Sequence, residues 1–176
     1  SSSWDACTKG ISGISTFDNT INNSPVSIGG RIKDLDLSLY LDSKDTRRLD
    51  TFIQYGVVAA SQAIADSGFL NYSTDLTRAG VNFGSGIGGI ETIEKNHKVY
   101  LEKGYKKVSP FMVPGSIINM ISGHISIKFG LRGSNVSTVT ACSSGNHCIG
   151  SAARSIAYGE CDVMVAGVSE MASRPL

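Results

Sequence analysis

The spacing of apolar residues divides the chain into alternating helical and strand-like segments. Apolar side chains recur every three or four residues, as in helices, over residues 43–67, 90–103, 115–129 and 143–158. Short apolar or β-branched runs predict strands over residues 79–83, 136–140 and 162–167. Because strands and helices alternate, we predict an α/β fold with a mainly parallel sheet between helix layers, joined by right-handed crossovers.

The flanking segments carry weaker patterns. Residues 1–9 predict a short helix, residues 26–32 allow short strands, and the proline-bracketed segment 109–114 favours an extended backbone. The helix over 43–67 has Ser43 or Asp45 as its expected cap and Gly68 as its end. Its expected buried stripe comprises Leu49, Phe52, Ile53, Val57, Ala60 and Ile64. The helix over 115–129 is expected to bury Ile117, Ile118, Ile121, Ile125 and Phe129.

Cys142 lies where the predicted strand 136–140 ends and the helix 143–158 begins. Ile149, Ala152, Ala153 and Ile156 supply the helical spacing of that helix. Backbone N–H groups at a helix start are unpaired and carry partial positive charge, which stabilises a nearby thiolate. Spacing alone is equally compatible with a small buried core cysteine, because free cysteine is common in protein cores.

Composition fits an ordinary globular core, with 41% hydrophobic and 18% charged residues. The formal net charge of +1 gives no general electrostatic reason to expect nucleic-acid binding. The four cysteines show neither C-x-x-C nor zinc-type spacing, so we expect no metal site, no disulfide framework and a reducing compartment. No apolar run is long enough to span a bilayer.

The segment Gly84-Ser-Gly86-Ile-Gly-Gly89 matches the G-x-G-x-x-G pattern between a strand and a helix. A dinucleotide-binding site is therefore one alternative. Such a site expects an acidic residue at the end of another strand about 20 residues later. Residues 100–107 are instead polar and lysine-rich, so we favour a glycine turn required by close backbone packing.

Several motifs together resemble one family, the β-ketoacyl-[acyl-carrier-protein] synthases of the type II, elongating class. The matching segments are Thr140-Ala-Cys142-Ser-Ser-Gly145, Gly84-Ser-Gly-Ile-Gly-Gly89, Asn119-Met-Ile-Ser-Gly-His124, Phe52-Ile-Gln-Tyr-Gly56 and Ala157-Tyr-Gly-Glu-Cys-Asp-Val-Met-Val-Ala-Gly167. The resemblance covers essentially all 176 residues. It implies a thiolase-like fold, layered α/β/α/β/α in two similar halves, with residues 1–176 as the N-terminal half.

The resemblance also implies a reaction. Cys142 is similar to the nucleophile that accepts an acyl chain as a thioester, after which malonyl-carrier protein loses CO2 and its carbanion attacks that thioester. The backbone N–H of Cys142 would supply half of an oxyanion hole. Ile87 is similar to the residue that lines the acyl pocket. Met112 stands where many relatives have Phe, a side chain that reaches the partner's acyl pocket.

The implied partner is acyl carrier protein, loaded with acyl or malonyl groups. Lys44, Arg47 and Arg48 match positions that hold this acidic protein, and Lys106 and Lys107 resemble a second patch that reaches the carrier at the dimer mate. The resemblance further implies a homodimer, no cofactor and a cytoplasmic location of the bacterial type. A plastid or mitochondrial location is also compatible with the sequence, because a transit peptide would precede Ser1.

Relative to the family pattern, we expect the first strand and the whole second half to be absent. The second half supplies two histidines that assist decarboxylation and the other oxyanion donor. His147 does not replace them, because five residues after Cys142 it points about 140° away around a helix. We therefore expect acylation of Cys142 without full turnover. The alternative function is an inactive, dimerising and carrier-binding fragment or pseudoenzyme subunit.

Overall fold

The computed structural model describes residues 2–16, 26–72 and 75–171. These residues fall into two units, one holding the described residues up to 36 and the other holding residues 37–171. All of the predicted site residues belong to the second unit.

The first unit contains a short helix and a two-stranded ribbon. Helix α1 spans Ser2–Thr8, and the antiparallel pair consists of β1 (Ile14–Thr16) and β2 (Ile28–Gly30). The predicted helix and the predicted strand near residues 26–32 are thus confirmed, except for Ser1, which lies outside the described residues.

A three-stranded parallel sheet forms the centre of the second unit. Its order is β4 (Asn135–Val136), β3 (Ala79–Gly84) and β5 (Val163–Val168). Ala79 pairs with Val163 and Gly84 with Val168, so β3 and β5 run in register along their whole length. Every residue of β3 is buried, which is typical of a parallel strand covered on both faces.

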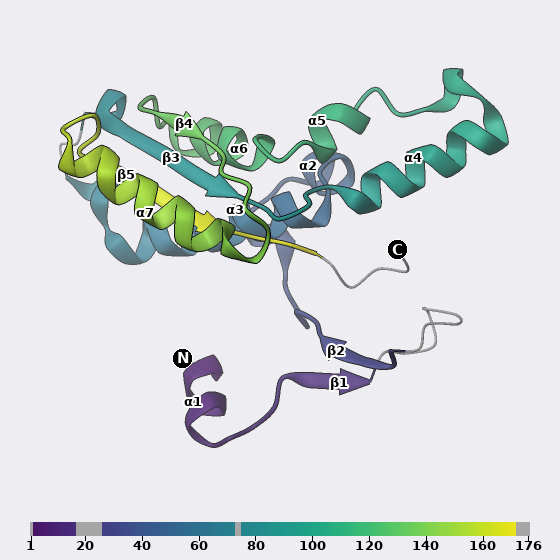
Figure 1. The fold of residues 1–176 in the computed structure, drawn as a ribbon, viewed down its shortest axis with the longest axis horizontal. Coiled ribbons are helices and arrows are strands. Elements are labelled where there is room, and N and C mark those ends of the chain that lie inside the picture. Colours follow the sequence, from purple (N-terminus) through teal and green to yellow (C-terminus); the bar gives the residue numbers. More distant parts are fainter. Residues whose placement is uncertain (1, 17–25, 73–74, 172–176) are drawn as a thin grey trace. The chain divides into compact units, whose positions relative to one another are not determined.

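Helices cover both faces of this sheet. Figure 1 shows α7 (Ser144–Ala157) on the near face of β3 and β5 and α3 (Thr51–Ser67) on the far face. Helix α6 (Met120–Phe129) packs against α3 and β3. The side chains that fill this side of the sheet are Phe52, Ile53, Val57, Val81, Phe83, Ile121 and Ile125. The predicted α/β layering is confirmed for this unit.

The remaining elements extend from this core. Helix α4 spans Ile90–Lys103, the range that the apolar spacing predicts. The short 3-10 turns are η1 (Leu37–Leu39), η2 (Phe69–Asn71), η3 (Leu76–Arg78), η4 (Tyr105–Lys107) and η5 (Ala141–Ser143). Within the described ranges, no helix combines the length and the apolar character that crossing a membrane requires.

The single helix predicted over 43–67 is wrong, because two helices occupy this range. Helix α2 spans Ser43–Arg48, and α3 begins at Thr51. Asp50 interrupts the helix: it is an extended N-cap whose carboxylate accepts a hydrogen bond from the Phe52 N–H. The cap of α2 is Asp42, not Ser43 or Asp45. The predicted apolar stripe is buried as expected, and Gly68 ends α3 with φ of 65°.

The range 109–129 also differs from prediction. Residues 109–114 are not extended, since helix α5 covers Met112–Ser116 and includes Pro114. Ile117 then adopts an extended backbone and separates α5 from α6. Proline fits within the first turn of α5 because its missing N–H has no helical partner there. As a result, Ile117 is exposed, whereas Ile121 and Ile125 are fully buried.

Helix α7 agrees with its predicted range to within a residue at each end, but its buried stripe is different. Ser144, Cys148 and Ala152 are buried, and Ile149 and Ile156 are exposed. Close packing of α7 on β3 explains why the face with small side chains is buried. A Cβ built at Gly84 of β3 would lie only 3.1 Å from the Cys148 Sγ of α7. Small side chains are therefore required where α7 meets β3.

His124 on α6 gives the fold a pH dependence. Burial lowers its pKa from 6.5, with Asp45 acting weakly in the opposite direction. Other groups facing the same cavity are Tyr40, Asp42 and Lys128. The unfolded chain therefore takes up this proton at higher pH than the folded chain, and protonation favours unfolding as pH falls below about 6.5.

We expect His124→Gln to reduce the loss of stability between about pH 7.5 and about pH 5.5, a window above carboxylate titration. Urea unfolding at several pH values would measure this slope. His97→Gln, at an exposed position of α4, is the matched control. Equal slopes in the wild type and in His124→Gln would contradict the prediction.

Candidate functional site

The chain reaches Cys142 through a loop fixed by side-chain hydrogen bonds. The predicted strand 136–140 is wrong beyond Val136, because β4 ends there. The Phe83 N–H instead donates to the Ser122 hydroxyl (3.2 Å), and the Phe83 carbonyl accepts from the Ser137 hydroxyl (2.6 Å). The Thr138 hydroxyl donates to the Asn82 side-chain oxygen (3.2 Å). The loop thus follows β3 without a regular ladder.

A tight backbone turn precedes the cysteine. Ala141 has φ of 52°, a left-handed conformation that costs a residue with a Cβ about 1 kcal/mol. The fully buried Ser144 hydroxyl stabilises this turn, because it accepts from the Thr140 N–H (2.9 Å) and donates to the Ala141 carbonyl (2.8 Å). The Ser143 N–H also donates to the Thr140 carbonyl (3.1 Å). These bonds fix the backbone on both sides of Cys142.

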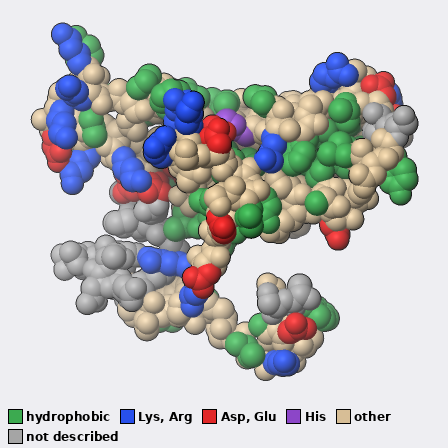
Figure 2. All heavy atoms as spheres, turned by 180° about the vertical axis from the view of Figure 1, so that it is seen from behind, with side chains coloured by type: hydrophobic (Ala, Val, Ile, Leu, Met, Phe, Trp, Pro, Cys, Tyr) green, Lys and Arg blue, Asp and Glu red, His purple; other side chains and the backbone are tan. Residues whose placement is uncertain are grey.

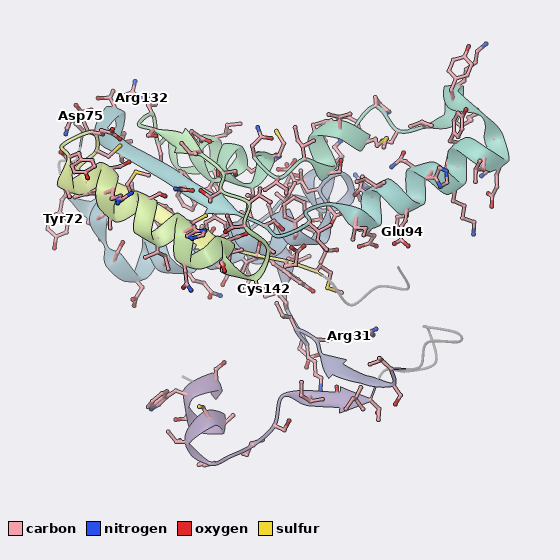
Figure 3. The ribbon with its side chains drawn as sticks, viewed as in Figure 1. Arg31, Tyr72, Asp75, Glu94, Arg132 and Cys142 are labelled. Atoms are coloured by element: carbon pink, nitrogen blue, oxygen red, sulfur yellow. The ribbon has the colours of Figure 1, made fainter. Side chains whose placement is uncertain are left out.

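This turn leaves the thiol of Cys142 accessible. Cys142 and Cys7 are exposed, whereas Cys148 and Cys161 are buried. Figure 3 places Cys142 at the end of α7 where the chain enters that helix. The alternative of a buried structural thiol is therefore wrong for Cys142 and describes Cys148 instead.

The glycine turn lies directly beside this junction. A Cβ built at Gly86 would lie 3.5 Å from the Ala141 carbonyl oxygen. Glu170, just after β5, accepts hydrogen bonds from the Gly86 N–H (2.7 Å) and the Ile87 N–H (2.8 Å). These N–H groups are the kind that would hold a phosphate in a dinucleotide site. Their occupation by a carboxylate argues against the dinucleotide alternative.

The two predicted acyl-pocket residues lie in different places. Ile87 is at the tip of the glycine turn, with a side chain that is 60% exposed. Met112 is half-buried at the first residue of α5, whose main neighbours are α4 and α6. The structure thus brings Ile87 to the Cys142 junction and leaves Met112 on a separate element.

The five predicted carrier-binding residues form two exposed groups. Lys44, Arg47 and Arg48 lie on α2, and Lys106 and Lys107 lie on η4 after α4. None of the five takes part in an ion pair with another residue inside the described ranges. Figure 2 shows Lys and Arg side chains gathered over the part of the second unit that α4 and η4 form.

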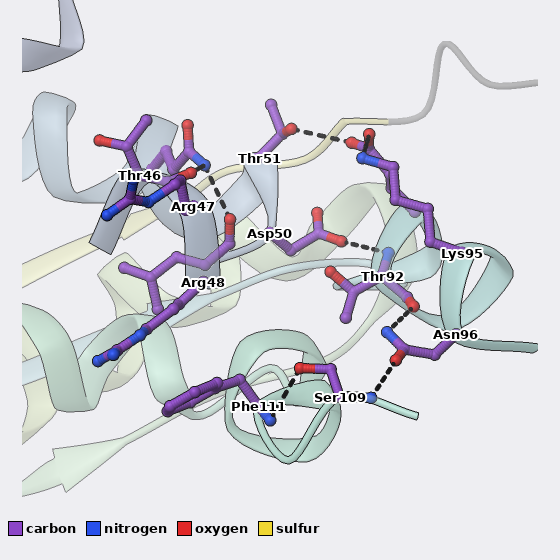
Figure 4. Close-up of a pocket in the computed structure, with 13 residues that line it drawn as sticks. Thr46, Arg47, Arg48, Asp50, Thr51, Thr92, Lys95, Asn96, Ser109 and Phe111 are labelled. Carbon is purple, nitrogen blue, oxygen red and sulfur yellow. Dashed lines mark hydrogen bonds and ion pairs between the residues drawn. The ribbon is translucent and has the colours of Figure 1, made fainter. Parts of the chain in front are cut away.

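A cavity of about 270 Å³ lies beside the α2 group. Figure 4 shows Arg47 and Arg48 from α2 at its edge, opposite Lys95 from α4. The Arg48 guanidinium stacks on the Phe111 ring, 4.3 Å from its centroid. The Lys95 Nζ lies 2.5 Å from the Oε1 of Glu91, one helical turn away. This ion pair partly neutralises the charge of Lys95. Sequence reasoning missed this cavity because its walls come from separate elements.

Two further observations limit the local chemistry. The His147 Nδ1 lies 2.6 Å from the Thr140 hydroxyl, so this ring is engaged with the loop before Cys142. Across the described residues, no group of three or more His, Cys, Asp and Glu side chains is placed to hold a metal ion.

Comparison with known proteins identifies the architecture. The family model for the beta-ketoacyl synthase N-terminal domain matches residues 1–176. The chain belongs to the β-ketoacyl synthase family.

Curated β-ketoacyl synthases share much of this sequence. The chain is 51% identical over 178 residues to 3-oxoacyl-[acyl-carrier-protein] synthase 2 of Vibrio cholerae, and the match covers 99% of the chain and 42% of that relative. The protein of the same name from Staphylococcus aureus is 40% identical over 169 residues, with 95% and 42% covered. The chain thus spans about two-fifths of the length of these relatives.

Solved β-ketoacyl synthases share the fold. A crystal structure from Burkholderia phymatum matches with a TM-score of 0.83 at 26% identity and covers 98% of this chain and 44% of that chain. A ketosynthase in complex with its type II polyketide acyl-carrier protein matches with a TM-score of 0.74 at 29% identity, with 82% and 42% covered. The predicted thiolase-like fold class is confirmed.

Proposed function

We propose that the chain is the N-terminal half of an elongating β-ketoacyl-[acyl-carrier-protein] synthase of fatty acid biosynthesis, with Cys142 as its acyl acceptor. The observation that carries this proposal is the exposed thiol of Cys142 in a fixed turn, directly after the left-handed Ala141. A nucleophile needs access to its substrate and a defined direction of attack, and this junction supplies both.

In the proposed acylation, the Cys142 thiolate attacks the carbonyl carbon of an acyl-carrier thioester. A new carbon–sulfur bond forms to Cys142, the bond to the carrier's sulfur breaks, and the carrier thiolate leaves and takes up a proton. The Cys142 N–H would stabilise the oxyanion of the tetrahedral intermediate. The subsequent condensation with malonyl-carrier protein, driven by loss of CO2, belongs to the complete protein.

Mapping the site of acylation tests this function. We expect incubation with an acyl-carrier substrate to add one acyl group to the peptide that contains Cys142 and none to the buried Cys148. Because Cys7 is also exposed, the experiment uses Cys7→Ser to remove the competing thiol. Acyl transfer confined to another residue, or no transfer at all, would contradict the function and favour a non-catalytic carrier-binding subunit.

We propose acyl carrier protein as the partner, bound through the α2 and η4 groups. The supporting features are the exposed lysines and arginines at these sites and the relative whose structure holds such a carrier. An acidic carrier would be attracted to these cations, and screening by salt would weaken that attraction.

We expect Arg47→Glu to weaken carrier binding about five- to tenfold at low ionic strength, because it replaces attraction with repulsion. Titration calorimetry at two salt concentrations would show a smaller difference at high salt. Arg154→Glu, a change at another exposed arginine, on α7, is the control. Equal weakening by both variants would assign the effect to net charge and not to the α2 group.

We also propose the homodimer that the family resemblance implies. Helices α4 and α5 expose several large apolar side chains, including Ile93, Leu101 and Val113. Apolar side chains exposed on neighbouring helices are compatible with a protein interface. Sedimentation equilibrium of the full-length protein would measure the state, and a monomer at micromolar concentration would contradict this expectation.

A further inference from the structure

Glu170 connects the carboxyl ends of two neighbouring strands that are far apart in sequence. It follows β5, and its Oε2 accepts hydrogen bonds from the Gly86 and Ile87 N–H groups after β3, at 2.7 and 2.8 Å. Its other oxygen, Oε1, is buried and has no hydrogen-bond partner within the described part of the chain. A carboxylate with this environment is not explained by packing alone.

The energetics of this arrangement indicate a specific role. Hydrogen bonds to an ionised acceptor are shorter and stronger than neutral ones. A buried polar atom without a partner costs about 1–3 kcal/mol, and most native structures avoid it. Glu170 thus combines two strong bonds to the glycine turn with an unfavourable Oε1. The strong bonds hold the backbone of Gly86 and Ile87 in one position.

The glycine turn packs against the backbone turn that precedes Cys142. A Cβ built at Gly86 would lie 2.9 Å from the Glu170 Oε2 and 3.5 Å from the Ala141 carbonyl oxygen. Gly86 is therefore packed between the carboxylate and the residue that precedes Cys142. Next to it, the Ile87 side chain projects from the turn and is 60% exposed.

We propose that Glu170 is a positioning residue that fixes the backbone of Ile87 beside Cys142 and so sets which acyl chain lengths the site accepts. This rests on the proposed function of Cys142 as the acyl acceptor. With the turn held by Glu170, the backbone of Ile87 cannot shift to make room for a different chain, and only rotation of the side chain about its own bonds remains. Without the carboxylate, the turn is free to move, and the site discriminates less between chain lengths.

Two measurements on the full-length protein test this role. Hydrogen–deuterium exchange of the Gly86 and Ile87 amides reports on the hydrogen bonds directly, without any requirement for activity. We expect exchange to accelerate about tenfold or more in Glu170→Ala. Acylation of Cys142 by short, medium and long acyl-carrier substrates reports on selectivity, and we expect the ratio of long-chain to short-chain kcat/KM to change by at least about threefold.

Conservative variants separate positioning from a general loss of structure. Glu170→Gln keeps an oxygen that both N–H groups can reach but loses the negative charge, so we expect exchange and selectivity between those of the wild type and those of Glu170→Ala. Glu170→Asp keeps the charge but is one methylene shorter, and it should behave as Glu170→Ala does. Glu170→Asp replaces Glu170→Ala in both measurements if Glu170→Ala does not fold. Glu160→Ala, which removes an exposed carboxylate bonded to Ser155, is the control for both measurements.

Each outcome has one meaning. Unchanged exchange at Gly86 and Ile87 in Glu170→Ala and Glu170→Asp overturns the positioning role. Accelerated exchange with unchanged chain-length ratios overturns the link to selectivity. If the wild type is not acylated at Cys142, the proposed function fails, and the link to selectivity fails with it. The exchange measurement still decides whether Glu170 holds the turn.

Discussion

Replacing Cys142 with alanine is expected to abolish formation of the acyl-enzyme thioester and to leave the fold intact. The methyl group of alanine cannot attack a carbonyl carbon, so the rate of acyl transfer should fall by at least about 10³-fold. Because the thiol is exposed and buries little surface, the free energy of unfolding should change by less than about 0.5 kcal/mol. Intact-mass detection of the thioester and urea unfolding measure the two effects.

Cys148→Ala provides the opposite pattern. Its sulfur is fully buried between α7 and β3, so its loss should reduce stability and leave acylation intact in the folded fraction. Persistent acylation of Cys142→Ala, or loss of acylation in folded Cys148→Ala, would show that the nucleophile has been assigned to the wrong cysteine.

Gly84→Ala should have the largest effect on stability. A Cβ at this position would overlap the backbone carbonyl oxygen of Thr138 and approach the Cys148 Sγ to 3.1 Å. Neither the loop nor α7 can retreat without disrupting the junction around Cys142. We expect a loss of more than about 4 kcal/mol, a large part of the 5–15 kcal/mol that stabilises a typical domain. Thermal unfolding would measure it.

Gly150→Ala is the matched control for that change. Gly150 lies within α7 and has no atom within 4 Å of a built Cβ outside its own helix. Alanine there should stabilise the protein by up to about 1 kcal/mol through helix propensity. A loss of stability in Gly84→Ala no larger than about 1 kcal/mol would mean that the junction tolerates movement.

Local sequence patterns correctly predicted those helix bounds that depend only on residues within or next to the helix. The range of α4 and the end of α3 at Gly68 follow from spacing and from a glycine with positive φ. The breaks at Asp50 and Ile117 did not follow, because they depend on tertiary partners. The Asp50 N–H donates to the Gly115 carbonyl (3.1 Å), and its carboxylate accepts from the Thr92 N–H (2.8 Å). The spacing of apolar residues along the chain gives no information about those distant contacts.

The candidate site also combines features that local sequence predicts with features that tertiary contacts determine. The position of Cys142 before a helix was readable from the residues around it. The groups that fix its surroundings, Ser144 and Glu170, were not recognised, because a serine in a small-residue helix and a glutamate after a strand have many ordinary roles. The role of Glu170 becomes visible only when the parallel strands place it against Gly86 and Ile87, which lie 84 and 83 positions earlier in the chain.

The left-handed backbone at Ala141 has a consequence for the energy of the acylation that we propose. Its conformational cost is met once, during folding, by the sheet, α7 and the Ser144 hydroxyl. In the acylation that we propose, attack by the thiol would then require little rearrangement of the main chain, because the amide of Cys142 already has a fixed direction. The reorganisation energy that a flexible peptide would spend in each cycle of that reaction would thus be absent from the barrier and would instead appear as reduced stability of the resting protein.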